Sequence, residues 1–457
     1  MKKHAIEQTT IFMSILKWLA LSSGMGIIIG ASVTLFLKIL QLSETSQHYL
    51  PFNYYYMLPF ALLATVWLVK KYAPDAEGHG TEKVIEAIHK KSGKIEIEVI
   101  PVKLLATVLT VFSGGSVGKE GPGAQIGAGM ASVISDFLHF SKADRKKLVI
   151  CGIGAGFASV FGTPIAGAIF GLEVLVVGLI RYDVLLPSFI AGFAAFSTAQ
   201  FLGVEYTYFD VNFVQHVELD LPLIIEVILA GLFFGMVSDI TITTLKRTSR
   251  LVQKIPLNIY VKAFSGGIIL ILLSSIFGEQ YFGLGLGTID NILQPNPTIS
   301  QDIPWYSFLI KTVFTSITLG VGGSGGIVTP IFFIGATSGH WFGVFAGDNH
   351  IAFFGALGFI SVLAGTTNAP IAATFMAMEL FGLEVAHYAA LSVVISFVMT
   401  GHRSVFASQI LAMKKSSMLK IEMGEDIAHA SIDIKDNYFD KIRDRIQQKR
   451  EERNKKN

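Results

Sequence analysis

Apolar residues occur in long blocks along this chain, and short polar or glycine-rich segments separate the blocks. The longest block covers residues 11–40, which is enough to cross a membrane. Several others are shorter than the ~20 residues that an upright span requires. These are residues 54–69, 223–240, 263–277, 308–319 and 389–399. Membrane-depth glycine and proline are tolerated where the freed backbone faces protein or a water-filled cavity, so we expect tilted or broken helices around an interior site.

The chain repeats itself at a constant offset. GGSVGKEGP at residues 114–122 returns as GGSGGIVTP at residues 322–330, 208 positions later. The upstream flank keeps this offset, since Lys103, Thr107 and Thr110 return as Lys311, Thr315 and Thr318. Downstream the register loosens, and Pro164 and Glu173 return as Pro370 and Glu379, 206 positions later. In an apolar chain, Gly/Pro-interrupted segments at matching places in two halves indicate a transport site between the repeats.

Composition decides the class of protein. Hydrophobic residues make up 51% of the chain, charged residues 15%, and the mean hydropathy is +0.56, which excludes an ordinary soluble domain. The sequence therefore predicts an all-α integral membrane protein, an inverted-repeat bundle of tilted and broken helices. We divide it into N-terminal spanning helices (1–72), a first repeat core (73–220), a second, inverted repeat (221–413, core 283–413) and a short cytoplasmic polar tail (414–457) that could carry one short helix.

The distribution of charge predicts the orientation. Lys2 and Lys3 precede the first span, and residues 441–457 hold eight basic and three acidic residues. Because Lys and Arg beside spans favour the cytoplasm, we predict that both termini are cytoplasmic, in a bacterial inner membrane or a plasma membrane. The basic link at residues 246–262 is expected on the same side. The single cysteine, Cys151, cannot form an internal disulfide and is interpreted as a packing residue.

Glu120 lies inside the first glycine-rich turn, just before Pro122 and an apolar helix. An ionisable group in a membrane segment costs roughly 2.5–3.5 kcal/mol on insertion scales, so its default interpretation is functional. Free N–H groups and the positive dipole end of the helix form an anion site, which the Glu120 carboxylate can itself occupy. We therefore predict a gate, opened by protonation or by displacement. The structural alternative is a helix-start glutamate that satisfies its own turn at the membrane surface.

Two further helix starts are candidates for the same path. The turn at residues 326–330 has Val328 where the first turn has Glu120, so we expect its amides to be free for an anion. Taken alone, this turn could equally be a tight connection between packed helices. The third start is Gly78-His79-Gly80, whose glycines let backbone approach a ligand closely. His79 donates a ring N–H to the anion, caps the following helix or lines an aqueous vestibule, and the sequence favours none of these.

These motifs resemble those of the CLC family of chloride channels and proton-coupled chloride exchangers. Residues 118–122, GKEGP, match the family's G-[RK]-E-G-P. Residues 326–330, GIVTP, are similar to its G-x-F-x-P, and residues 78–82, GHGTE, are similar to its G-S-G-I-P. The resemblance covers about residues 78–414 and implies a homodimer with one pore per subunit and Glu120 as the gating glutamate. The anion-binding positions that we carry over are His79, Gly80, Lys119, Gly121, Ile327, Val328 and Phe406.

Three positions depart from the family pattern. His79 replaces a serine, and Phe406 replaces a tyrosine whose hydroxyl touches the central anion, so both side-chain donors of that site change. Val174 stands where many exchangers carry an inner proton-transfer glutamate, which resembles the channel members. Because Glu120 remains, water or another acid could still complete a proton relay. The paired CBS domains of many relatives are not found, so nucleotide regulation through them is not expected.

Two pairs of repeated charged residues allow more than one interpretation. Glu173 and Glu379 each follow an apolar stretch, which favours helix-end carboxylates at the membrane surface or at a subunit interface. Lys103 and Lys311 either raise the potential along the anion path or are lysines that snorkel to the surface.

Other function classes fit the sequence less well. A phosphate-binding loop, G-x4-G-K-[ST], fails because Ser113 and Glu120 occupy its first and last positions. The zinc motif H-E-x-x-H does not occur in the sequence. An intramembrane serine protease built from Ser116 or Ser324 with His402 would leave the duplication without a purpose.

We therefore predict transport of a small anion such as chloride by a multi-pass protein embedded in a lipid bilayer. We expect no catalytic residue, metal, cofactor or nucleic-acid partner. Val174 favours channel-like conduction through the Glu120 gate. The alternative is a proton-coupled antiporter of chloride or another halide that uses a different inner proton route.

Overall fold

The computed structural model describes residues 2–209, 221–294, 303–347 and 351–434. In these residues the first half of the chain forms eight α-helices. They are α1 (Lys2–Gln47), α2 (Leu58–Tyr72), α3 (Thr81–Lys90), α4 (Val99–Phe112), α5 (Glu120–Phe137), α6 (Lys142–Phe161), α7 (Pro164–Glu173) and α8 (Leu185–Phe201). The second half forms α9 (Leu221–Lys254), α10 (Ile259–Phe277), α11 (Leu286–Leu293), α12 (Ser307–Gly320), α13 (Val328–Ala346), α14 (Ile351–Thr367), α15 (Pro370–Phe381) and α16 (Leu383–Met399).

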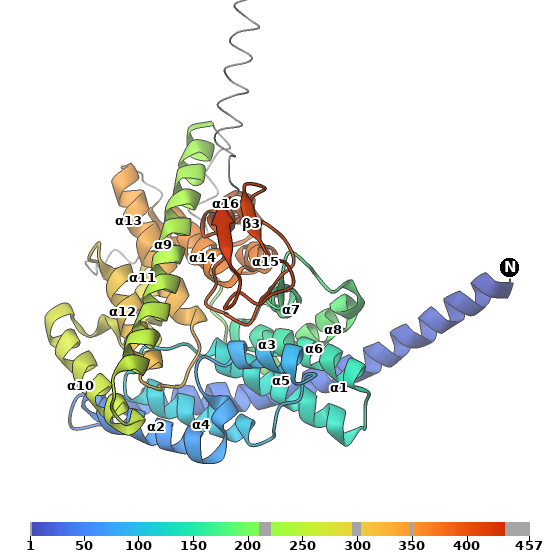
Figure 1. Ribbon diagram of the computed structural model, residues 1–457, viewed down its shortest axis with the longest axis horizontal. Coiled ribbons are helices and arrows are strands. Elements are labelled where there is room, and N and C mark those ends of the chain that lie inside the picture. The colour runs from blue at the N-terminus through green and yellow to red at the C-terminus, as the bar shows by residue number, and fades with distance from the viewer. Residues whose placement is uncertain (1, 210–220, 295–302, 348–350, 435–457) are drawn as a thin grey trace, which may run out of the picture.

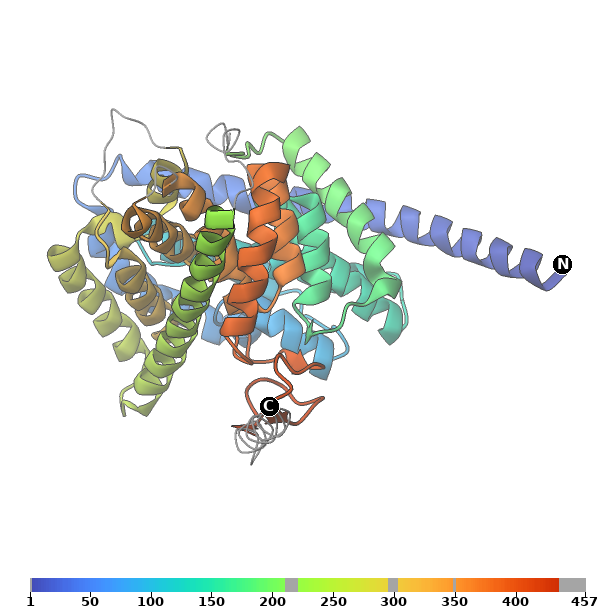
Figure 2. The ribbon, with the colours of Figure 1, turned by 90° about the horizontal axis from the view of Figure 1, so that it is seen from above.

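The second eight helices repeat the packing of the first eight. α5 packs on α6 as α13 packs on α14, α1 on α8 as α9 on α16, and α2 on α4 as α10 on α12. Three pairs of equivalent helices join the halves: α2 with α10, α5 with α13, and α7 with α15. Figures 1 and 2 show α9 to α13 on one side of the body and α5 to α8 on the other. The predicted all-α inverted-repeat fold is confirmed.

Helix lengths agree with a bundle of tilted and broken spans. Four helices of the described residues are long and apolar enough to cross a membrane: Lys3–Gln47, Tyr182–Phe201, Leu221–Lys254 and Ile259–Phe277. Six shorter apolar helices of the described residues, including α7, α12, α14 and α15, have 10–17 residues. With 46 residues, α1 is about 69 Å long at 1.5 Å per residue, and its first turns project beyond the body (Figure 2).

Proline and glycine position the starts of the short helices. Pro164 and Pro370 occupy the first positions of α7 and α15, where proline's missing N–H is not needed. Pro122 and Pro330 lie in the first turns of α5 and α13. The glycine-rich turns before α5 and α13 leave the N–H groups of those first turns without helical partners inside the protein.

The polar tail differs from prediction in its described part. Instead of a short helix, β3 (Leu419–Ile421) and β4 (Ile432–Ile434) form an antiparallel pair. Apolar Leu419 and Ile421 alternate with Lys420 and Glu422, and a period of two favours a strand. Just before the tail, β2 (Ile410–Leu411) pairs in parallel with β1 (Val176–Val177), which follows α7. The basic segment 441–457 lies outside the described residues.

Candidate functional site

The two repeated glycine-rich turns contact each other directly. The Gly118 N–H donates to the Gly326 carbonyl at 2.6 Å, and the Gly326 N–H donates to the Gly118 carbonyl at 2.5 Å, as an isolated antiparallel bridge. The starts of α5 and α13 are therefore adjacent and are related by the same antiparallel symmetry as the repeats.

The start of α3 reaches the same point. Gly80 has a φ of +84°, and a Cβ on it would lie 2.5 Å from the Gly121 carbonyl oxygen. A Cβ on Gly326 would lie 2.7 Å from the Gly121 nitrogen. Only glycine permits this approach, so the three helix starts expected from the sequence converge at Gly80, Gly121 and Gly326.

Buried hydroxyl groups brace the two turns. The Ser116 N–H donates to Thr318 Oγ1 at 3.2 Å, and the Ser324 N–H donates to Thr110 Oγ1 at 3.2 Å. Ser116 Oγ also lies 3.0 Å from Thr315 Oγ1. Each half thus supplies the threonines that hold the turn of the other half, which explains why these threonines recur at the same offset.

Glu120 lies at the centre of this convergence and is 1% exposed. Its Oε2 accepts the Thr329 N–H at 3.0 Å, and its Oε1 accepts the Thr329 hydroxyl. The carboxylate therefore occupies the amide end of α13, where charge-assisted hydrogen bonds and the helix dipole favour an anion.

Two expectations about Glu120 are corrected. The amides of the second helix start are not all free, because the Thr329 amide binds the carboxylate. Glu120 also does not lie at the surface of its own turn, since its side chain crosses to the other repeat. The antiparallel contact between Gly118 and Gly326 brings the start of α13 within hydrogen-bonding distance of Glu120. This contact depends on how the two halves pack and is not visible in the sequence.

Two cavities lie beside the converging helix starts, and they are lined by different residues. The narrow cavity, of about 130 Å³, contains Glu120. The wide cavity, of about 560 Å³, reaches Ile327, two positions before the threonine that holds Glu120. The narrow cavity is lined by Lys119, Glu120, Phe161, Thr329, Phe332 and Phe359, among others, and the wide cavity by Glu77, His79, Glu82, Lys246, Arg250, Lys262 and Ile327, among others. Among the described residues the two linings share no member: Glu120 and Thr329 line the narrow cavity, and Ile327 of the second turn lines the wide one.

His79 and Phe406 meet beside the convergence. Their ring centroids are 5.6 Å apart, at an interplanar angle of 49°. Phe406 is fully buried, whereas His79 lines the wide cavity. Nδ1 of His79 is buried and has no hydrogen-bond partner in the described part of the chain. Of the three possibilities left open for His79, the structure favours a vestibule-lining ring.

The other predicted positions are distributed around this centre. Gly80, Gly121, Ile327 and Val328 lie in the convergent turns, and Lys119 lies in the lining of the narrow cavity with Glu205 and Asp290. Val174 is buried just after α7, and its carbonyl accepts a hydrogen bond from Gln409 Nε2 at 2.8 Å.

Lys103 and Lys311 do not snorkel, because both are 0% exposed. Lys103 Nζ donates to the carbonyls of Ala76, at 3.2 Å, and Gly78, at 2.5 Å. Lys311 Nζ donates to the carbonyls of Tyr281, at 3.1 Å, and Gly283, at 2.9 Å. Each lysine thus holds the loop that leads to the short helix of its own half, α3 or α11.

Glu173 and Glu379 form reciprocal helix caps, in agreement with their expected place at helix ends; a position at the membrane surface or a subunit interface stays a prediction. Glu173, at the end of α7, accepts the N–H groups of Ile371 and Ala372 at 3.0 and 2.8 Å. Glu379, near the end of α15, accepts the N–H groups of Ile165 and Ala166 at 2.9 and 2.8 Å. The carboxylate of each helix satisfies the free amides of its antiparallel partner.

The residues of the protease alternative do not come together. Ser116 and Ser324 form hydrogen bonds with threonines of the other repeat, whereas His402 Nε2 accepts the Lys415 N–H at 2.8 Å.

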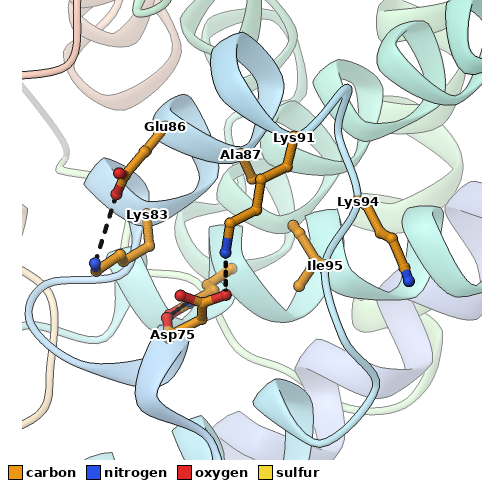
Figure 3. Close-up of a pocket in the computed structure, with 8 residues that line it drawn as sticks. Asp75, Lys83, Glu86, Ala87, Lys91, Lys94 and Ile95 are labelled. Atoms are coloured by element: carbon orange, nitrogen blue, oxygen red, sulfur yellow. Dashed lines mark hydrogen bonds and ion pairs between the residues drawn. The ribbon is translucent and has the colours of Figure 1, made fainter.

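A small crevice of about 10 Å³ lies beside α3 (Figure 3). There Lys91 Nζ lies 2.5 Å from Asp75 Oδ2, and this hydrogen bond raises the pKa of Lys91. The crevice is lined by ion pairs at the surface, and such pairs contribute little to the free energy of unfolding.

Sequence reasoning missed two residues of the site. Thr329 lies inside the recognised GIVTP motif, but only contact with the other repeat shows that it binds Glu120. Glu82 is the last residue of the GHGTE motif, where the family pattern has proline, and it lines the wide cavity and accepts hydrogen bonds from Ser408. This difference from the pattern was the available signal.

Inverted repeats, broken helices and helix starts that converge on a buried carboxylate are typical of multi-pass membrane transporters, which bind their substrates between the repeats. The chain belongs to the CLC family, because the family model described as voltage gated chloride channel matches residues 60–401. Its function, at that level, is CLC-type anion transport.

Individual relatives agree with this assignment. A chloride/fluoride channel protein of Pseudomonas syringae pv. tomato is 34% identical over 418 residues, 90% of each chain. The crystal structure of a CLC-type fluoride/proton antiporter matches with a TM-score of 0.81 and 30% identity, covering 88% of this chain and 99% of that one. A slow cyanobacterial Cl⁻/H⁺ antiporter matches with a TM-score of 0.71 and 20% identity, over 84% and 94% of the two chains, which shows the shared fold.

Proposed function

We propose that this protein moves a small inorganic anion, fluoride or chloride, in exchange for protons, with Glu120 as both gate and proton carrier. The observation that carries the proposal is the buried Glu120 carboxylate, which is bound to the Thr329 amide and hydroxyl in the lining of the narrow cavity. The mechanism uses the anion as substrate and needs no metal or cofactor. We propose further that the protein works as a homodimer, as the CLC resemblance implies.

The coupling follows from competition for one set of amides. An ionised carboxylate and a mobile anion both favour the positive end of α13, and both cannot occupy it. Protonation neutralises Glu120, which weakens its hold on Thr329 and allows the anion to enter. When the anion leaves, a deprotonated Glu120 can return, having delivered its proton to the other side.

Fluoride is the more favoured substrate. The two hydroxyl donors expected at a central chloride site are replaced by His79 and Phe406, whose rings lie together. Two relatives at 30% identity or more are named for fluoride, one as a chloride/fluoride channel protein and one as a fluoride/proton antiporter. A changed donor set and fluoride-named relatives both support a selectivity different from that of a chloride-only site.

Channel-like conduction remains the second candidate, and Val174 favours it. Its side chain is buried and cannot exchange a proton. In a channel, anions would move passively, and protonation of Glu120 would only open the path.

The experiment is a flux assay on protein reconstituted in liposomes, with fluoride and chloride measured by ion-selective electrodes and protons by a pH dye. Wild-type protein is expected to move protons uphill when an anion gradient is imposed. Glu120→Gln is expected to conduct anions at a rate that does not depend on pH and to move no protons. Equal pH dependence in wild type and Glu120→Gln would refute the role of Glu120.

Reversal potential separates the two candidates. Under a combined anion and proton gradient, an exchanger reverses at a potential set by both gradients, whereas a channel reverses at the anion potential alone. Reversal at the anion potential would establish channel-like conduction and reject exchange.

A further inference from the structure

Glu82 is an acidic group at the inner end of the wide cavity that the gate does not use. It lies in the first turn of α3, two residues after Gly80. Its Oε1 accepts the Ser408 N–H at 3.0 Å and the Ser408 hydroxyl at 2.6 Å. Its Oε2 is buried and has no hydrogen-bond partner among the described residues. An unsatisfied, buried carboxylate oxygen is costly, which is a reason to look for a proton or a water there.

His79 shares this environment. Both side chains line the wide cavity, and both contact one loop, since the His79 ring meets Phe406 and Glu82 binds Ser408. A Cβ on Gly121 would collide with the His79 carbonyl, so the His79 backbone touches the residue that follows Glu120. The His79 backbone therefore reaches the gate turn, and its imidazole lines the same cavity as Glu82, with its Nδ1 buried and unpartnered among the described residues.

We propose that Glu82 and His79 form the proton route from the wide cavity to Glu120, in place of the side chain that Val174 lacks. This inference rests on the proposed proton exchange. A proton from cavity water binds the Glu82 carboxylate and passes to one nitrogen of neutral His79. The imidazole releases a proton from its other nitrogen towards Glu120 and returns to its neutral form, so one proton moves per cycle. Imidazole is suited to this step because its two nitrogens can accept and donate in turn.

Charged groups surround the pair. They are Glu77 before α3, Lys83 and Glu86 on α3, Lys103 on α4, Lys246 and Arg250 on α9, and Lys262 on α10. Burial raises the pKa of Glu82, against the opposing hydrogen bonds from Ser408, and burial together with Lys103 and Lys83 disfavours a charged His79. A carboxyl group with a raised pKa is better suited to take up and release a proton, and the basic groups attract anions into the wide cavity.

The test compares proton movement per anion in liposomes for wild type, Glu82→Gln and Glu77→Gln. Glutamine keeps an oxygen that can accept from Ser408 but cannot carry a proton. Glu82→Gln is expected to lower the number of protons moved per anion by roughly tenfold or more, in line with the loss of a positioned acid–base group. Glu77→Gln removes the same charge from an exposed position of the same cavity and is expected to leave the ratio unchanged.

Two further variants exclude a purely structural effect. Ser408→Ala removes one hydrogen bond to Glu82 but keeps the carboxylate, so the proton-to-anion ratio should persist with an altered pH profile. Glu82→Asp should restore part of the ratio that Glu82→Gln loses, and His79→Gln should lower it. If wild type and Glu82→Gln move the same number of protons per anion, the inference about Glu82 is refuted while the proposed exchange stands. Wild type that moves anions without protons would overturn the proposed exchange and the inference together.

Discussion

Thr329 gives Glu120 two donors of different kinds. The backbone N–H is present whatever residue stands there, whereas the hydroxyl depends on threonine or serine. The hydroxyl bond to a charged carboxylate contributes roughly 1.5–3 kcal/mol. Side-chain chemistry at this one position therefore adjusts how firmly the gate is closed.

Thr329→Val should consequently weaken the seated gate and raise anion flux at neutral pH, on the order of tenfold, since 1.36 kcal/mol corresponds to a factor of ten. Valine has nearly the same shape, and Thr329→Ser, which keeps the hydroxyl, is the matched control expected to behave as wild type. Flux from liposomes measures the effect. Unchanged or slower flux in Thr329→Val would show that the hydroxyl does not hold the gate.

The buried lysines make a second prediction at the residue scale. Lys103→Met leaves the carbonyls of Ala76 and Gly78 without a donor, and each buried unsatisfied carbonyl costs about 1–3 kcal/mol. Lys311→Met does the same to Tyr281 and Gly283 in the second half. Both variants should unfold at a lower temperature in detergent, whereas Lys70→Met, at an exposed position, should not. A wild-type melting temperature for Lys103→Met would refute the anchoring role.

At the scale of elements, α7 and α15 form an antiparallel pair that is joined at both ends. Helices of 10 and 12 residues are too short to be stable alone, so their packing and caps must hold them. The repeat of Pro164 and Glu173 as Pro370 and Glu379 is visible in the sequence. Which amides the carboxylates bind is not, because each partner lies about 200 residues away in the other half.

Glu173→Gln and Glu379→Gln should each lower the melting temperature, because an amide can satisfy only one of the two N–H groups that a carboxylate accepts. The loss of a charged hydrogen bond is expected to cost roughly 1.5–3 kcal/mol in each variant. The caps lie at opposite ends of the pair, so the double variant should show nearly additive losses. Glu384→Gln, in the exposed first turn of α16, is the control. A stable double variant would contradict the capping function.

At the scale of the whole molecule, the inverted repeat fixes which loops share a membrane face. The buried Cys151 allows a direct test, since it should resist a membrane-impermeant maleimide. Lys3→Cys and Leu257→Cys, at exposed positions, are predicted to be cytoplasmic, and Tyr49→Cys, in the loop after α1, to lie on the opposite face. In intact cells only Tyr49→Cys should be labelled, and permeabilisation should expose the other two. Labelling of Lys3→Cys in intact cells would contradict cytoplasmic termini.

The class of protein, the duplication and the three helix starts follow from the order of amino acids alone. Apolar blocks, a repeated offset and glycine-rich turns are local properties, and they predicted the helix starts and the gate at Glu120, whereas Gly80 and Gly121 were assigned to the site by the resemblance to the CLC family. The domain boundaries drawn from the same patterns remain predictions.

Only the tertiary structure decided what these residues touch. Glu120 binds Thr329, Glu173 caps α15, Lys103 holds the loop before α3, and Glu82 faces the same cavity as His79. Each of these partners lies on another element, and in two cases in the other repeat. Periodicity and spacing describe the environment along one helix. Whether the amides at a helix start are free or bound to a carboxylate depends on how the two halves pack against each other.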